Sequence, residues 1–201
     1  FAAIKGGIMI LGIEGSPRKE GNSHNLLKAI ISGAREEKSQ VQEVHLRDYC
    51  YEPCVGCERC RKYKICTRFQ DGMARLYPVI KEASGLVLVT PVHNYNVTSW
   101  IKAFIDRLYC FYDFADTRPR QWSSRLSGQG KKAVIAAIAE QESEKDMGFA
   151  LDAMRLPLQA LGYEILSEIP VLRLLDRGVI IEHKDILNKA REAGKVLAQS
   201  T

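Results

Sequence analysis

The sequence predicts a doubly wound α/β domain, in which helices cover both faces of one parallel β-sheet. Its 201 residues are enough for one well-buried domain and too few for two ordinary ones. Short apolar runs alternate with longer amphipathic segments along the chain. The apolar runs lack polar alternation, which is typical of strands buried on both faces, and right-handed crossovers join such strands.

The N-terminal elements follow this alternation. The first strand is expected in IMILGIEG, residues 8–15, and the first helix in HNLLKAIISGAREEK, residues 24–38. Asn22 or Ser23 stands where the N-cap of this helix belongs. A second short strand is expected in VQEVHL, residues 41–46.

The central elements begin with a cysteine-rich loop, residues 47–71. A second helix is expected in DGMARLYPVIKEAS, residues 71–84, where Pro78 should cause a kink or a restart. The third strand is GLVLVT, residues 85–90, and a polar loop separates it from a third helix. That helix carries an apolar face and an i, i+4 charge pair, Lys102 and Asp106.

Four further elements complete the domain. They are a strand in residues 131–139, a helix in 146–162, a strand in 163–171 and a closing amphipathic helix in 184–199. Five strands is the count of the flavodoxin-like fold rather than the six of a full dinucleotide-binding fold. We therefore expect a single flavodoxin-like domain over residues 9–201.

Two segments lie outside this pattern. Residues 113–130 form a polar insertion, expected as an exposed loop that contacts a neighbouring subunit or covers the active site. Residues 1–8 show no signal-peptide pattern, and we expect them to be an extension added ahead of a natural start at Met9.

Composition narrows the classes of function. The net charge of +5 is modest, and its Lys and Arg residues are mixed with Asp and Glu, so no nucleic-acid partner is expected. The apolar runs are far shorter than the roughly 20 residues of a membrane span, so no membrane partner is expected either. Six cysteines without an export signal indicate a reducing compartment, and we expect a cytoplasmic protein.

The segment EGSPRKEGNSH follows the first strand, at the sheet edge where ligands of doubly wound folds bind. A helix N-terminus attracts phosphate, the Ser16 and Ser23 hydroxyls are donors, and Arg18 adds charge. The spacing differs from both the Walker A loop and the Gly-x-Gly-x-x-Gly turn. From these residues alone, a phosphate loop and an ordinary strand-to-helix turn both remain open.

The cysteine loop has the spacing Cys54-x2-Cys57-x2-Cys60-x5-Cys66. A reducing compartment disfavours disulfides, whereas zinc accepts four thiolates and buried thiols also serve as small apolar side chains. Three cysteines at this spacing suit a cubane iron–sulfur cluster, although the fourth lies further away than in bacterial ferredoxins. The isolated Cys50 and Cys110 are expected to be buried free thiols.

Taken in order, GSPRKEGNS, the cysteine loop and TPVHNYNVTSWIKAFIDR resemble the NADPH-dependent FMN reductase-like flavoproteins, and among them the iron–sulfur flavoproteins. Specific motifs carry the resemblance from residue 9 to about residue 110, and a looser likeness extends to the C-terminus. His93 stands where the family usually has tyrosine, and Tyr95 follows two residues later. The resemblance implies non-covalent FMN and a homodimer or tetramer with the flavin at a subunit interface.

The resemblance also implies two sets of site residues. FMN would be contacted by Ser16, Pro17, Arg18, Asn22, Ser23, His24, Thr90, Pro91, Val92, His93, Asn94 and Tyr95. A 4Fe–4S cluster would be bound by Cys54, Cys57, Cys60 and Cys66, with Gly56 allowing tight turning and Arg59, Arg61, Lys62 and Lys64 offsetting its charge. Glu140 and Gln141 are candidates for a third flavin contact by position only. Lys102, Asp106 and Arg107 match family positions but are interpreted as structural.

The function implied is transfer of electrons between a ferredoxin-type or NAD(P)H donor and a small-molecule acceptor. With a cluster, single electrons would pass between the donor and FMN; without one, FMN would take hydride from NAD(P)H and reduce a flavin, quinone or other small acceptor. No side chain is predicted to be a general acid or base. The alternatives are a flavodoxin-like carrier, disfavoured by the positive charge, and a zinc-binding regulatory or interaction module.

Overall fold

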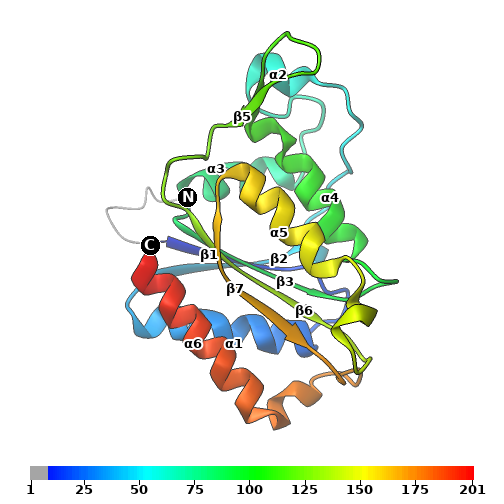
Figure 1. Cartoon of the computed structure of the whole chain (residues 1–201), viewed down its shortest axis with the longest axis vertical. Helices are drawn as coiled ribbons and strands as arrows, with labels where there is room; N and C mark the ends of the chain where they lie inside the picture. The colour runs from blue at the N-terminus through cyan, green and yellow to red at the C-terminus, as the bar shows by residue number, and fades with distance from the viewer. Residues whose placement is uncertain (1–8) are drawn as a thin grey trace.

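A computed structural model describes residues 9–201, and the prediction made for residues 1–8 lies outside this range. Its centre is a five-stranded sheet in the order β2-β1-β3-β6-β7, with every neighbouring pair parallel (Figure 1). This is the 2-1-3-4-5 order of the flavodoxin-like fold. The strands are β1 (Met9–Glu14), β2 (Gln40–His45), β3 (Gly85–Pro91), β6 (Lys132–Ile138) and β7 (Glu164–Val171).

Helices cover both faces of the sheet, as the apolar strands require. Figure 1 shows α1 and α6 on one face and α3, α4 and α5 on the other. Each helix layer buries its own apolar cluster against the sheet. Successive side chains of β1, β3 and β6 point to opposite faces of the sheet, so they belong alternately to one cluster and the other. The helices are α1 (Asn22–Glu36), α3 (Met73–Glu82), α4 (Ser99–Arg107), α5 (Ala150–Leu161) and α6 (Lys184–Ser200).

Short helices occupy the connections. The cysteine loop contains the single-turn helix α2, and four 3₁₀ turns precede or follow longer elements. These are α2 (Arg59–Tyr63), η1 (Leu46–Asp48), η2 (Leu108–Phe111), η3 (Glu144–Met147) and η4 (Val179–Glu182). Within residues 9–201, no helix has the length and apolar character needed to cross a membrane.

The start of α1 differs from the prediction. Gly21 is the N-cap, while Asn22 and Ser23 are already the first two helical residues. The Asn22 side chain does not cap the helix because it bonds to residues 176 and 180, beyond β7. The second helix also differs in one respect: α3 runs through Pro78 as a single element, so no restart occurs there.

The polar insertion is more ordered than predicted. It contains an antiparallel hairpin of β4 (Tyr112–Phe114) and β5 (Trp122–Ser124) rather than only an exposed loop. Ion pairs join it to the cysteine loop, at 3.2 Å between Arg61 and Asp116 and 2.9 Å between Arg120 and Glu58. The insertion is therefore attached to the cysteine loop at α2 by charged side chains.

Candidate functional site

A pocket opens at the carboxyl ends of β1, β3 and β6, where the loops after these strands meet. Its wall comes from segments 16–23, 91–93 and 138–141, with residues 174–177 closing one side. Ligands of doubly wound folds bind at this edge. The predicted flavin contacts that line it are Ser16, Pro17, Arg18, Asn22, Ser23, Pro91, Val92 and His93, and Glu140 and Gln141 line it as well.

The loop between β1 and α1 and the start of α1 line this pocket. The N-cap Gly21 supplies no side-chain hydrogen bond, and the first turn of α1 contains no acidic residue. The first N–H groups of a helix have no partner within the helix, and the helix dipole favours an anion beside them. Ser16 is 4% exposed, and its Oγ accepts a hydrogen bond from the Arg18 N–H at 3.1 Å, which keeps the loop tight.

The chain after β7 holds this loop from the opposite side. Arg18 Nη1 donates to the Leu175 carbonyl at 2.9 Å. Asn22 Nδ2 donates to the Asp176 carbonyl at 2.9 Å, while its Oδ1 accepts from the Ile180 N–H at 3.1 Å. Two predicted contacts thus also attach the loop to the C-terminal segment.

Sequence reasoning missed the pocket residues of this C-terminal segment, Leu174, Leu175 and Arg177. They are far from the first loop along the chain, since Arg18 and Leu175 are 157 positions apart, and they form no motif of their own. Their position along the chain could have identified them. They follow a strand of the same parallel sheet, so they must lie at the same edge of the sheet as the first loop.

Two of the predicted contacts support the pocket from behind. Thr90 is fully buried, and its Oγ1 donates to the Pro91 carbonyl at 2.9 Å and accepts from the Thr98 N–H at 3.3 Å. His24 faces Glu14 on the far side of the first loop. Neither side chain lines the pocket.

The remaining two predicted contacts form a tight turn beside the pocket. Asn94 and Tyr95 have φ values of 48° and 62°, and backbone hydrogen bonds between His93 and Asn96 close the turn. Left-handed backbone at two consecutive residues that are not glycine is strained and frequent at ligand sites. Tyr95 is 61% exposed at the tip of this turn and does not line the pocket.

The four motif cysteines line a second cavity, between the cysteine loop and α4. Cys54 and Cys57 are exposed and Cys60 and Cys66 half-buried, and all four are free thiols. Desolvation raises the pKa of Cys60, and the neighbouring Cys66, Cys54 and Cys57 raise it further. The predicted set is therefore one spatial cluster.

The backbone turns sharply between these thiols. Gly56 has a φ of 64°, as expected for a residue that allows tight turning, and nothing lies within 4 Å of the position a Cβ would occupy. Glu58 and Lys64 flank α2 with φ values of 53° and 58°. Left-handed backbone costs such residues free energy, so the loop conformation is maintained by contacts elsewhere.

Those contacts close the base of the loop. Arg107 Nη1 donates to the Glu52 carbonyl at 2.6 Å and to Asp71 Oδ2 at 2.7 Å, and the Glu52 N–H donates to the same carboxylate at 3.1 Å. The Gly72 N–H donates to the Cys50 carbonyl at 2.8 Å. Arg107 is thus structural, as predicted, and joins the two ends of the cysteine loop.

Burial distinguishes the two isolated cysteines. Cys110 is 3% exposed beside the thiol cavity, and burial raises its pKa to about 12, as expected of a buried thiol. Cys50 is exposed, so the prediction that it is buried was wrong. Its carbonyl accepts a hydrogen bond from the Gly72 N–H, but this contact does not cover its side chain.

The basic residues of the loop are partly engaged. Arg61 pairs with Glu58 and Asp116, each at 3.2 Å, and Lys64 pairs with Asp113. The predicted helical pair is present, with 2.6 Å between Lys102 Nζ and Asp106 Oδ1. The acids of the hairpin therefore already balance part of the positive charge that was expected to offset a cluster.

Comparison with known proteins agrees with this architecture. Residues 8–159 match the family model described as NADPH-dependent FMN reductase. An iron-sulfur flavoprotein from Archaeoglobus fulgidus is 35% identical over 193 residues, which cover 94% of this chain and 79% of that protein. A second one from that organism is 37% identical over 110 residues, covering 53% and 55% of the two chains. Similarly, the match to an iron-sulfur flavoprotein from Methanosarcina thermophila, 32% identical, covers 49% of this chain and 51% of that one. The chain thus spans about half the length of most of these relatives.

Solved structures with low sequence identity share the fold. An FMN-dependent NADH-azoreductase from Bacillus anthracis, in complex with FMN, has a TM-score of 0.71 at 16% identity, covering 95% of this chain and 99% of that one. An archaeal flavodoxin has a TM-score of 0.57 at 13% identity, covering 96% and 97%. The predicted flavodoxin-like fold is confirmed.

Proposed function

The chain belongs to the NADPH-dependent FMN reductase family, a family of FMN-dependent oxidoreductases, and we propose that this member transfers electrons from NAD(P)H or a ferredoxin-type donor to a small-molecule acceptor. The observation that carries the proposal is the coincidence of two features in one chain. The start of α1, which has no side-chain cap, lines a pocket at the switch point of the sheet. Four free thiols line a second cavity.

The first pocket fits the phosphate of FMN. The N–H groups at the start of α1 and the Ser16 and Ser23 hydroxyls would donate to the phosphate oxygens, and Arg18 would supply charge. The segment from Pro91 to His93 would lie along the flavin ring, with Glu140 and Gln141 as a third contact. Bound FMN supplies the chemistry by accepting a hydride or single electrons, while the protein orients the ring and excludes water.

At the second cavity, a 4Fe–4S cluster would be bound by Cys54, Cys57, Cys60 and Cys66. Four thiols on one cavity, a left-handed glycine between the first two, and nearby guanidinium groups suit a compact anionic cluster. The Arg107–Asp71 bridge holds the loop ends together independently of any metal. The cluster would add transfer of single electrons between a donor and the flavin.

The deciding measurement is iron, acid-labile sulfide and bound FMN per chain on anaerobically purified protein, with a visible spectrum. Four iron and four sulfide per chain with FMN would support the full proposal. FMN without iron would reduce the cysteine loop to a structural role and favour the cluster-free reductase. Protein without FMN or iron, even after reconstitution, would refute the proposal.

A paired variant tests the assignment of the thiols. Cys60→Ser should lose the iron while keeping FMN, whereas Cys50→Ser, the same change at an exposed thiol outside the motif, should keep both. Equal iron contents in the two variants would contradict the ligand set.

A cytoplasmic location, which suits reduced thiols, remains a prediction.

A further inference from the structure

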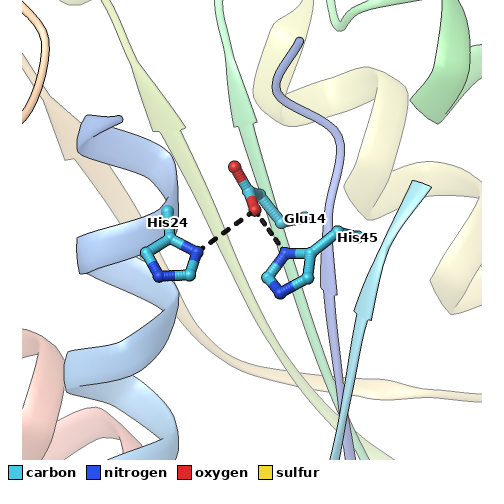
Figure 2. A group of neighbouring side chains, drawn as sticks. All are labelled: Glu14, His24 and His45. Atoms are coloured by element: carbon cyan, nitrogen blue, oxygen red, sulfur yellow. Dashed lines mark hydrogen bonds and ion pairs between the residues drawn. The ribbon is translucent and has the colours of Figure 1, made fainter. Parts of the chain in front are cut away.

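A buried carboxylate lies behind the phosphate-binding loop, outside both cavities. Glu14, the last residue of β1, is fully buried. Its Oε2 lies 2.5 Å from Nδ1 of His45, at the end of β2, and 3.7 Å from Nδ1 of His24, in the first turn of α1. Figure 2 shows this oxygen between the two imidazole rings, each of which turns Nδ1 toward it.

The hydrogen bonding of this group is incomplete. Glu14 Oε1 and His24 Nδ1 are both buried and have no hydrogen-bond partner among the described residues. Buried polar atoms without a partner cost free energy and are rare, so they indicate a missing ligand or water. Two such atoms occur here in one group of three side chains, which come from β1, α1 and β2.

We propose that Glu14, His24 and His45 form a binding site for a borderline first-row divalent cation of the zinc class. One carboxylate oxygen and one ring nitrogen of each histidine all lie within 4.8 Å of one another. Ligand atoms around tetrahedral zinc are about 3.3 Å apart, given bonds of about 2.0–2.1 Å. The two observed separations, 2.5 Å and 3.7 Å, lie on either side of that value, so small side-chain shifts are sufficient.

The donor set determines the class of metal. Two imidazoles and one carboxylate suit zinc, nickel or cobalt, whereas calcium and magnesium prefer oxygen ligands alone. Three protein ligands would leave one position for water. The site shares no residue with the cysteine loop and depends on neither proposed cofactor.

Arg47 opposes the cation and thereby provides a test. Its Nη1 lies 3.0 Å from Glu14 Oε2 and 3.3 Å from the Ser16 carbonyl, so it orients the carboxylate and supports the loop. The same positive charge must weaken binding of a cation to that carboxylate. Removing the charge in Arg47→Gln, which keeps a donor for Ser16, should therefore tighten cation binding by about tenfold or more.

The direct experiment is ¹⁵N NMR of the histidine side chains in the FMN-loaded chain, titrated with zinc. The chain has four histidines, and the thiols, which also bind zinc, do not appear in this spectrum. The resonances of His24 and His45 should shift together and saturate, while those of His93 and His183 stay in place. Unchanged His24 and His45 resonances at saturating zinc would overturn the proposal.

Calorimetry then tests the carboxylate. In a background with Cys54, Cys57, Cys60 and Cys66 replaced by Ser, one cobalt or zinc should bind per chain. Glu14→Gln should weaken this binding at least tenfold, and His183→Asn, a histidine at the start of α6, should leave it unchanged. Equal affinities in the two variants would overturn the proposal, and the NMR titration of the unmutated chain decides it if Glu14→Gln fails to fold.

Discussion

At the residue scale, the Arg107–Asp71 pair shows how a buried ion pair fixes a loop. The Arg107 side chain is 2% exposed and that of Asp71 13%. Desolvation alone would raise the pKa of Asp71, but hydrogen bonds from Arg107 and the Glu52 N–H outweigh it and lower the pKa. The folded protein is therefore stabilised by the ionised carboxylate.

Asp71→Asn should lower the free energy of unfolding at pH 7 by about 3 kcal/mol, because it leaves the buried Arg107 charge uncompensated. The folded pKa lies below the unfolded one, so the stabilisation is complete above about pH 4 and is lost as the pH falls through the folded pKa. Urea unfolding at pH 7 and at pH 3 should show the gap between variant and parent narrowing in acid.

The control for this change is Asp106→Asn on the exposed pair with Lys102. An exposed ion pair contributes little, so this variant should lose less than about 0.5 kcal/mol at pH 7. A loss as large as that of Asp71→Asn would contradict the assignment of the effect to burial.

The uncapped start of α1 gives a second prediction at a single residue. Gly21 has φ −83°, and a Cβ there meets Arg18 Cβ at 3.4 Å, an ordinary contact, so other residues fit. Gly21→Asp should cap the helix and stabilise the FMN-free protein by about 0.3 kcal/mol. The same carboxylate competes for the N–H groups and repels phosphate, so FMN affinity should fall at least about tenfold.

Flavin-fluorescence titration and thermal unfolding of the FMN-free protein measure the two effects. Gly21→Asn supplies the cap without the charge and should lose less affinity. If Gly21→Asp bound FMN as tightly as the parent, the phosphate would not lie at this helix.

At the element scale, α1 and α6 pack at van der Waals contact through two glycines. A Cβ on Gly194 would lie 1.7 Å from the Ile30 carbonyl oxygen, and one on Gly33 would lie 1.9 Å from that of Arg191. Both clashes are with backbone, so no side-chain rotation relieves them. The crossing of these two helices therefore depends on small residues.

Gly194→Ala should consequently destabilise the protein by about 2 kcal/mol or more through overpacking. In an unpacked helix the same change would stabilise by roughly 1 kcal/mol, so the sign of the effect is diagnostic. Urea unfolding measures it, with Asn188→Ala on the exposed face of α6 as the control, expected to be neutral or slightly stabilising. A stabilised Gly194→Ala variant would mean that the two helices are further apart.

The elements themselves could largely be predicted from the sequence. Apolar runs without alternation identified β1, β3 and β6, because these strands are buried on both faces. The edge strands β2 and β7 were also predicted, although they are only partly buried and carry polar residues. The hairpin was missed, since Tyr112–Phe114 and Trp122–Ser124 are three residues each and pair across a polar loop without an apolar pattern. The N-cap was misplaced because Asn22 bonds across the fold, which no local pattern records.

At the scale of the whole molecule, the position of the pocket could be predicted from the sequence because the topology of the sheet determines it. A parallel sheet brings the loops after β1, β3 and β6 to one edge, so the order of the elements along the chain was enough to pair the first two loops. The Glu14 group could not be found in this way. Its outer members, Glu14 and His45, are 31 residues apart, and no sequence motif joins His45 to the segment EGSPRKEGNSH, which contains the other two.

The surface beside the pocket carries two exposed aromatic side chains and leads to a prediction about oligomeric state. Tyr95 is 61% and Phe149 69% exposed, and the Phe149 N–H donates to the Tyr95 carbonyl at 2.8 Å, so the two aromatic residues are neighbours. Exposed aromatic side chains next to a ligand site are typical of protein interfaces, where such residues are enriched. We expect a homodimer, or a tetramer built from dimers, that buries this pair and places the pocket near the interface.

Phe149→Asp should then shift the protein toward monomer, because a carboxylate would be buried without a partner in the interface. Size-exclusion chromatography with light scattering measures the mass, with Ile181→Asp, a change at another exposed apolar residue that is 53% exposed, as the control. We expect the control to keep the mass of the parent. If Phe149→Asp also kept it, this aromatic pair would lie outside the interface. A parent that is a monomer with FMN bound would show that the flavin site is complete within one chain.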